Sequence, residues 1–461
     1  MKLQNEYDLV VVGGGIVGAG VFRDAALHGL KTLIIDKKDF TSQTSQSSSK
    51  MLHGGIRYLE TMDFELVSES LHEKNLWLKI APHLCQEKSF YLPIYETSKR
   101  PMWMMKIGFF LYDFLSGFQN SPHRMLSKEQ VLKDFPSLNP IGLKGAGVYY
   151  DAIVEDAKLT LEVIYDGLKE TNCHALNYWE LKDLKPMGEK LWVSLVDGLT
   201  GETQEVLTRD LVFATGPFTD QLLAKWPWLQ WSPQLLPSKG SHLWIKKEHL
   251  PIKYPMVMTP PDGRVIFVIP QRGSVLVGTT EVQNETSNYF DLTPSQKEIT
   301  YLLDNLNQNF PNLLNGPITQ NQIQSAFAGI RPLVKDGNTQ NLGKTARNHK
   351  TYWPKSNIGV VIGGKYTTFR VMAQDILMPI MKRHQISYNP EATKRPLRQR
   401  SLISPFKKVT ITKELMTEIR RTELVRTPQD LWVRRLGVAN QNHWQQSDEI
   451  GPYIDHGLSL F

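Results

Sequence analysis

Apolar and polar positions at the start of the chain follow a strand, helix, strand order. Tyr7–Val12 is an apolar strand pattern interrupted only by Asp8, and after a glycine-rich turn a helical spacing of apolar residues continues to about His28. Gly29 is a typical helix stop, and a second apolar run covers Leu30–Asp36. This order predicts a β-α-β unit with two parallel strands.

Two later apolar strands have the same character. Leu211–Gly216 ends in a turn of small residues, and Ile358–Ile362 is followed by the segment Gly363–Thr368 and a helical pattern to about Lys382. Between 232 and 282 the pattern instead favours antiparallel strands, with a hairpin through Gln271–Gly273. The strands expected there are Ser241–Ile245, Val265–Pro270 and Ser274–Gly278. The pattern predicts an α/β protein in which separated pieces of a parallel sheet enclose an antiparallel domain.

Composition narrows the classes of function. A chain of 461 residues can bury more than one core, and its net charge of +7 suits an anionic cofactor, a phosphorylated substrate or an acidic membrane surface. Nucleic acid is not expected as a partner, because no recognised binding module appears. Cys85 and Cys173 lack metal or redox spacing, so we predict no metal site and a reducing compartment. Without a secretory signal before Tyr7, we expect a cytoplasmic protein.

The turn after the first strand carries the glycine fingerprint of dinucleotide binding. Gly13 permits the tight turn, Gly15 lets the backbone approach a pyrophosphate, and Gly18 allows close helix packing. Asp36, at the end of the second strand, is placed to accept hydrogen bonds from a ribose. The polar run Thr41–Lys50 leads directly into His53 and its neighbours, which predicts a loop pressed against the ligand.

The chain resembles the FAD-dependent, membrane-associated glycerol-3-phosphate dehydrogenases that reduce quinone. The resemblance implies a Rossmann-like FAD-binding domain interleaved with an antiparallel-sheet substrate domain, the architecture of glucose-inhibited and amino-acid-oxidase-like flavoproteins, plus a short helical C-terminal segment. It rests on segments spread in the family's order over about residues 7–385: Gly13–Gly20, Thr44–Glu60, Pro101–Asp113, Ala214–Pro217, Lys239–His242, Gly278–Thr280, Gly329–Leu333 and Gly363–Arg370.

We expect three domains with these boundaries. The FAD-binding domain takes 1–75, 145–222 and 340–388, and the substrate domain takes 76–144 and 223–339. Residues 389–461, basic and polar in composition, form the C-terminal helical domain, where Asp430–Arg435 still looks like the family's helical region. The family's C-terminal cap is expected to be abbreviated in this chain.

The resemblance also implies roles for particular residues around the cofactor. Ser45, Ser49 and Lys50 would line the FAD phosphates or the flavin, and Thr215 and Gly216 would lie beside the cofactor. Gly364, Lys365 and Thr367 would approach the isoalloxazine. A cation such as Lys365 near the flavin makes physical sense, because it stabilises the anionic reduced ring.

For the substrate, the resemblance points to three arginines, since guanidinium forks bind phosphate with paired charge-assisted hydrogen bonds. Taken singly, each is more typical of a surface ion pair. The implied substrate-binding residues are Arg57, Arg331 and Arg347, with Tyr58, His53 and Thr280 nearby.

The implied reaction is hydride transfer from C2 of glycerol 3-phosphate to flavin N5, giving dihydroxyacetone phosphate. It needs a group that takes the hydroxyl proton. His53 and His242 are the candidates, with Glu281 behind them, and Arg331 belongs to the same catalytic group. Three positions near the substrate depart from the family's common residues: Glu281 in place of Asp, Phe327 in place of Tyr, and Phe218 in place of Trp.

The most apolar segment, Met102–Phe118, is shorter than the ~20 residues that span a bilayer and contains Lys106 and Asp113. It fits an interfacial amphipathic helix, and equally a core or partner-facing helix. The resemblance implies a peripheral protein on the inner face of the cytoplasmic membrane, with quinone as acceptor and a homodimer among the alternatives for assembly.

The alternative hypotheses for the function are a flavin oxidase or dehydrogenase for a 2-hydroxy acid or amino acid, a glycerophosphate oxidase that uses oxygen, and a catalytically impaired flavoprotein that serves as a binding module.

Overall fold

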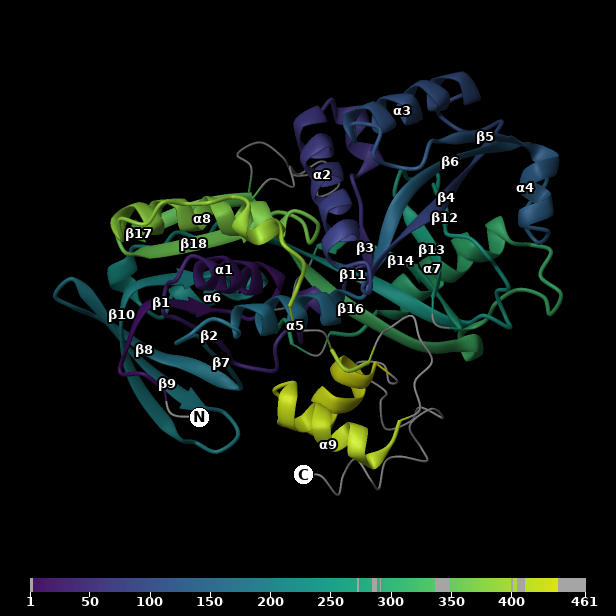
Figure 1. Cartoon of the computed structure of the whole chain (residues 1–461). Coiled ribbons are helices and arrows are strands. Elements are labelled where there is room, and N and C mark those ends of the chain that lie inside the picture. Colours follow the sequence, from purple (N-terminus) through teal and green to yellow (C-terminus); the bar gives the residue numbers. More distant parts are fainter. Residues whose placement is uncertain are drawn as a thin grey trace.

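A computed structural model gives the architecture and describes residues 3–271, 273–283, 288–290, 292–335, 349–398, 401–403 and 411–437. Two β-sheets lie side by side, each with its own helices, and a small helical unit lies below them (Figure 1).

The first sheet has eight strands among the described residues, in the order β17-β18-β10-β1-β2-β7, with β9 pairing β10 and β8 pairing β9. Neighbours from β18 to β7 run parallel, so both β1 and β10 are central strands. The strands are β1 (Glu6–Val12), β2 (Thr32–Asp36), β7 (His174–Asn177), β8 (Trp179–Met187), β9 (Lys190–Asp197), β10 (Thr203–Phe213), β17 (His349–Lys355) and β18 (Ile358–Gly363).

Alternate side chains of β1 enter two different cores, as expected for a central strand buried on both faces. Leu9 and Val11 belong to the core beneath the helices α1 (Ile16–Leu27), α5 (Asp156–Gly167) and α8 (Phe369–Arg383). Val10 and Val12 face the opposite core, which β8 and β9 help to build. The predicted β-α-β unit is confirmed, and its Gly13–Ile16 turn lies at the carboxyl end of β1.

The second sheet has ten strands in the described part of the chain, in the order β15-β11-β14-β13-β12-β4-β6-β3, with β16 beside β11 and β5 beside β6. The predicted hairpin is present, and Gln271 pairs Ser274 across it. The strands are β3 (Met51–Leu52), β4 (Cys85–Tyr95), β5 (Arg124–Ser127), β6 (Leu143–Val154), β11 (Leu235–Lys246), β12 (Met256–Met258), β13 (Ile266–Gln271), β14 (Ser274–Gly278), β15 (Val282–Gln283) and β16 (Ile323–Val334).

The two sheets confirm the predicted fold class. The boundary predicted at residue 145 falls inside β6, which pairs β4 in the antiparallel sheet, so the return to the parallel sheet comes with α5 and β7. The predicted strand and helix around Ile358 and Lys382 correspond to β18 and α8.

Longer helices cover the second sheet, and short ones occupy the connections. α2 (Phe64–Ile80) and α3 (Met102–Leu115) lie at the top of the molecule (Figure 1). None of the helices in the described part of the chain has both the length and the apolar character needed to cross a bilayer. The remaining helical segments are α4 (Lys128–Asp134), α6 (Thr219–Leu223), α7 (Gln296–Asn309), η1 (Thr44–Gln46), η2 (Ile56–Thr61), η3 (Gly216–Phe218), η4 (Pro227–Leu229), η5 (Gln320–Gln322) and η7 (Ala392–Lys394).

The C-terminal unit consists of the α-helix α9 (Lys413–Thr422) and the π-helix η8 (Asp430–Leu436). Met416, Ile419 and Trp432 form part of its own small apolar core. This confirms a short helical segment after the parallel sheet, drawn in yellow in Figure 1.

Candidate active site

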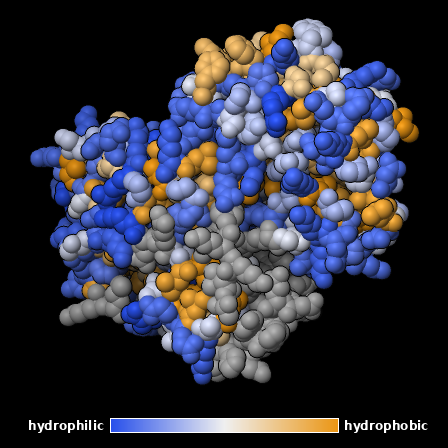
Figure 2. Space-filling model, turned by 45° about the vertical axis from the view of Figure 1, so that its right-hand side comes forward, coloured by the Kyte–Doolittle hydropathy of each residue, from blue (hydrophilic) through white to orange (hydrophobic). Residues whose placement is uncertain are grey.

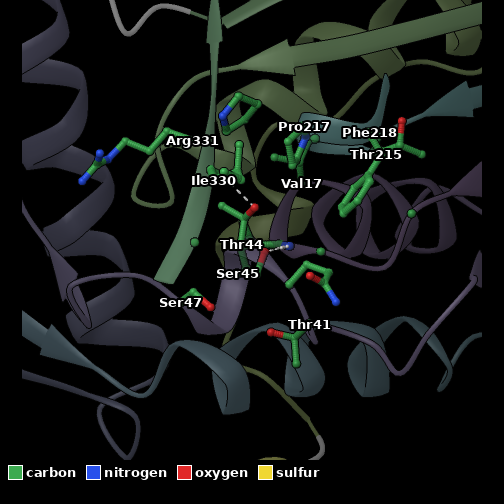
Figure 3. A pocket seen from close by; sticks show the side chains of 18 of the residues that line it. Val17, Thr41, Thr44, Ser45, Ser47, Thr215, Pro217, Phe218, Ile330 and Arg331 are labelled. Atoms are coloured by element: carbon green, nitrogen blue, oxygen red, sulfur yellow. Dashed lines mark hydrogen bonds between the residues drawn. The ribbon is translucent and has the colours of Figure 1, made fainter. Parts of the chain in front are cut away.

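A cavity of about 430 Å³ opens where the two sheets meet. This volume lies within the roughly 300–1,000 Å³ that is usual for ligand pockets. Its wall is built from the turn after β1, the loop 41–53, the end of β10, β16 and the loop between β18 and α8. Figure 3 shows Arg331 at one side of the cavity and Thr215 and Phe218 at the other, with Thr44 and Ser45 between them.

Backbone geometry explains the glycines of the β1–α1 turn. Gly13 has φ +108°, and a Cβ at Gly18 would lie 1.8 Å from the Gly13 carbonyl oxygen. Gly15 lines the cavity and caps α1 without a side-chain hydrogen bond, so this helix end presents backbone to the cavity. A helix N-terminus of this kind favours a pyrophosphate.

Asp36 lines the same cavity and is held by backbone N–H groups. The amide of Gly14 donates to Oδ2 at 2.7 Å, and the amide of Lys38 donates to Oδ1 at 2.8 Å. Burial raises the pKa of Asp36 to about 6. Trp179 and Glu180 line the same part of the wall, which we define as the Asp36 end of the cavity.

The loop 41–53 contributes several hydroxyl groups to the wall. Ser45 Oγ accepts from the Ile16 amide at 2.8 Å, and Ser49 Oγ lies 2.9 Å from His242 Nε2. Lys50 lies outside the cavity lining, and its Nζ pairs with Asp156 at 2.7 Å. Thr215 and Gly216 line the wall at the end of β10, as predicted.

The β18–α8 loop places a lysine in the cavity wall. Gly363 and Gly364 take φ +80° and +74°, and Lys365 follows with only 9% of its surface exposed. Its Nζ donates to Ser70 Oγ at 3.1 Å and lies 4.2 Å from the centre of the Tyr58 ring. Thr367, the third predicted residue here, accepts from the His53 amide at 3.2 Å.

His242 is a buried wall residue on β11. Its ring stacks on Phe327 at 4.9 Å, and its Nδ1 has no hydrogen-bond partner within the described structure. Burial, with the charges of Arg331 and Lys50, lowers the pKa of His242 to about 3. The imidazole is therefore neutral at neutral pH, and one of its nitrogens is an acceptor.

Arg331 lies on β16 and lines the cavity. Its Nη2 donates to Thr279 Oγ1 at 2.8 Å and to the Thr280 carbonyl at 3.2 Å. These bonds fix the guanidinium at the end of the 278–280 turn, where it lowers the pKa of His242. A fixed guanidinium in a cavity wall can bind an anionic group of a ligand.

Three predicted substrate residues, Arg57, Tyr58 and Thr280, are not among the residues that line the cavity. The same holds for Glu281, which was predicted as a candidate proton acceptor. Arg57 is half-buried on η2, and its guanidinium carbon is 5.9 Å from the Tyr58 ring centre, the ring that Lys365 also contacts. Thr280 is buried, and its hydroxyl donates to Glu298 at 2.7 Å. Arg347 lies outside the described residues.

Sequence reasoning missed Glu298, at the start of α7. Its carboxylate accepts from Ser241 and Thr280 and pairs with Lys239 at 2.8 Å. Although burial acts to raise it, these hydrogen bonds hold the pKa of Glu298 at about 2. In the sequence, Glu298 forms a capping box with Ser295, which indicates the start of a helix. That pattern gives no sign that Glu298 also bonds to Ser241 and Thr280.

The arrangement of these residues fits FAD. A helix N-terminus that begins with a glycine, a carboxylate at the end of β2 and a buried lysine beside paired left-handed glycines suit pyrophosphate, ribose and flavin respectively. The chain belongs to the FAD dependent oxidoreductase family, whose model matches residues 8–362. Its cofactor is FAD, as predicted.

Individual relatives within this family show which of its members the chain is similar to. The chain is 34% identical over 374 residues to the aerobic glycerol-3-phosphate dehydrogenase of Bacillus subtilis (strain 168), covering 80% of this chain and 66% of that protein. It is 33% identical to the enzyme of the same name from Staphylococcus haemolyticus (strain JCSC1435), covering 84% and 69%. The chain thus spans about two thirds of the length of these relatives.

Solved structures agree in fold. The glycerol-3-phosphate dehydrogenase from Bacillus halodurans, complexed with FAD, superimposes with a TM-score of 0.67 at 26% identity, covering 85% of this chain and 68% of that one. Glycine oxidase from Geobacillus kaustophilus gives 0.63 at 18% identity, covering 86% and 100%, a likeness of fold alone.

Proposed function

We propose that this chain oxidises glycerol 3-phosphate to dihydroxyacetone phosphate and passes the electrons to quinone. The observation that supports the substrate most directly is Arg331, a guanidinium fixed in the wall of the cofactor cavity by Thr279 and the Thr280 carbonyl. The curated relatives at 34% and 33% identity carry the same activity in their names. Quinone is proposed from the resemblance alone.

In the proposed mechanism the chain binds and orients the substrate. When bound, FAD supplies a two-electron acceptor for the hydride from the substrate C2. Arg331, in the cavity wall, would bind the phosphate, and Lys365, in the same wall, would provide positive charge beside the flavin ring. Arg57, Tyr58, Thr280 and Arg347 remain proposed substrate residues, with Thr280 acting through the hydrogen bond that its carbonyl accepts from Arg331.

Of the three proposed proton acceptors, His53 and His242 line the cavity and Glu281 does not. His242 is neutral at neutral pH, because its pKa is about 3. A dianionic phosphate on Arg331 would offset one of the charges that lower this pKa, so substrate binding would make His242 a better base. We therefore favour His242 as the group that receives the hydroxyl proton.

The test is anaerobic reduction of the bound flavin, followed by its visible absorbance. Glycerol 3-phosphate should bleach the flavin, while a 2-hydroxy acid and glycine should not. Arg331→Ala should raise the KM for glycerol 3-phosphate roughly 30-fold or more, since removing one partner of a buried charge pair costs about 2–5 kcal/mol. FAD should stay bound, and Arg264→Ala, at a half-exposed arginine that does not line the cavity, should match wild type.

Two results would remove the proposal. Bleaching by the 2-hydroxy acid or by glycine instead would assign a carboxylate substrate, which an arginine also binds. A yellow protein that no compound bleaches would indicate a catalytically impaired binding module. Turnover with oxygen rather than a quinone analogue would replace only the acceptor and define a glycerophosphate oxidase.

We also propose a peripheral contact with the inner face of the cytoplasmic membrane, made by α3. Trp103, Ile107, Phe110 and Phe114 recur at helical spacing and expose 62%, 59%, 57% and 58% of their surface. Figure 2 shows orange and pale-orange side chains gathered at the top of the molecule, where α3 lies in Figure 1. A net charge of +7 favours an acidic lipid surface.

A further inference from the structure

The C-terminal unit contacts both walls of the Asp36 end of the cavity. One wall is the loop 36–39 after β2, in which Asp36 and Lys37 line the cavity. The other is the turn 177–179 between β7 and β8, which ends in the lining residue Trp179. Residues of the segment 424–435 bond to each wall, although none of them lines the cavity itself.

The first wall is held by two arginines on one carboxylate. Arg434 Nε and Arg435 Nη1 both donate to Asp39 Oδ2, and Arg435 Nη2 donates to Oδ1 at 2.9 Å. All three residues are at least 97% buried. Burial alone would raise the pKa of Asp39, but the charges and hydrogen bonds of Arg435 and Arg434 outweigh it and hold that pKa below its usual value.

The second wall is held by η8 and the residues just before it. Tyr178 donates its hydroxyl to Asp430 Oδ1 at 2.6 Å, and the same carboxylate oxygen accepts from Arg434 at 2.7 Å. Asn177 joins the walls, because its Nδ2 donates to Asp39 Oδ1 at 2.8 Å and to the Leu424 carbonyl at 2.9 Å. One connected network therefore runs from the loop 36–39 through η8 to the turn 177–179.

Stability alone does not account for such a network. Burying charges costs several kcal/mol per ion, and well-packed apolar side chains often stabilise a core as well or better. A guanidinium fork does, however, fix the position of a carboxylate in two directions. Arg434 and Arg435 fix Asp39, three residues after the carboxylate placed to bind the FAD ribose.

We infer that the segment 424–436 is part of the FAD-binding apparatus, with Asp430, Arg434 and Arg435 as positioning residues that set the spacing of the two walls around the adenosine end of FAD. This inference goes beyond the proposed activity, because it concerns cofactor retention and holds whatever the substrate is.

The test compares two Tyr→Phe variants of the full chain. Tyr178→Phe removes the hydroxyl that bonds Asp430 and keeps the ring. Tyr388→Phe is the matched control, because Tyr388 also donates to a carboxylate, Asp24 at 2.8 Å, but neither residue lines the cavity. The FAD Kd is measured by titrating the apoprotein and following flavin fluorescence, and the thermal unfolding midpoint of each apoprotein is recorded alongside.

Tyr178→Phe should weaken FAD binding about tenfold, because the lost hydrogen bond ends on a charged carboxylate and such bonds are stronger than those between neutral groups. Tyr388→Phe should lower the thermal unfolding midpoint of the apoprotein about as much as Tyr178→Phe does. Its FAD Kd, however, should stay at the wild-type value. Arg434→Lys keeps the charge and loses the fork, so it should weaken FAD at least as much. A wild-type FAD Kd in Tyr178→Phe, or equal weakening in both tyrosine variants, overturns the inference whatever Arg434→Lys does.

Discussion

The protonation of His242 links one residue to the pH stability of the whole chain. Its folded-state pKa is about 3, whereas an exposed histidine titrates near 6.5. Between these values the unfolded chain binds a proton that the folded chain does not, so stability is present above about pH 6.5 and is lost as the pH falls towards 3. Each pH unit in this window removes up to about 1.4 kcal/mol.

His242→Gln should therefore flatten the acid side of the stability profile. The variant has no group that titrates at this position, so its unfolding midpoint should fall less than that of wild type between pH 6.5 and 5, with FAD at a fixed concentration. His249→Gln, at a half-exposed histidine outside the cavity lining, is the control and should follow wild type. Parallel profiles for His242→Gln and wild type would show that the buried imidazole is not the source of the acid sensitivity.

The sequence could predict those site residues whose position is determined by a local turn. Gly13, Gly15, Gly18, Asp36 and Lys365 all line or shape the cavity, because a glycine turn at the end of a parallel strand fixes the backbone around it. Lys50 illustrates the limit. Its neighbours Ser49 and Met51 line the cavity, but its own side chain pairs with Asp156, a partner 106 residues away. Long-range partners of this kind leave no local pattern.

At the scale of elements, α3 combines a buried inner face with an exposed apolar outer face. Phe109, Tyr112 and Asp113 are buried, and the Tyr112 hydroxyl donates to Asp151 at 2.8 Å. The sequence predicted a helix over 102–118 without deciding between core, partner and membrane. Only the three-dimensional packing separates the faces, because apolar residues occur all around the helix.

The proposed membrane contact predicts that Ile107→Ser/Phe110→Ser will lower binding to vesicles of mixed zwitterionic and anionic lipid at least tenfold. Burying a large apolar side chain contributes about 1.5–3 kcal/mol, and both side chains are more than half exposed in the free protein. Flotation through a density gradient gives the bound fraction.

The matched control is Met187→Ser/Leu314→Ser, which removes two apolar side chains that are 58% and 98% exposed on other elements. It should float with wild type. Equal loss of flotation in both double variants, or no flotation of the wild-type protein, would exclude α3 as the contact. Anaerobic flavin reduction in the absence of lipid should be unchanged in both variants, since these residues do not line the cavity.

At the scale of the molecule, the cofactor cavity is the place where the two sheets meet. The parallel sheet has an apolar core on each face, to which Val154 and Leu235 of the antiparallel sheet also contribute, and the antiparallel sheet has two further cores of its own. The cavity wall takes Asp36 and Gly364 from the first region, and His242 and Arg331 from the second. A dinucleotide in this cavity would therefore contact both regions at once.

This arrangement predicts that FAD couples the unfolding of the two sheets. Calorimetry of the apoprotein should resolve two transitions, and FAD at 100 times its Kd should merge them while stabilising the folded chain by about 2.7 kcal/mol. AMP offers the control, because it can occupy only the Asp36 end, whose lining belongs to the parallel sheet. It should raise the first transition and leave the second in place. A single transition in the apoprotein, shifted alike by AMP and by FAD, would mean that protein contacts alone join the sheets and that the cofactor adds affinity without coupling them.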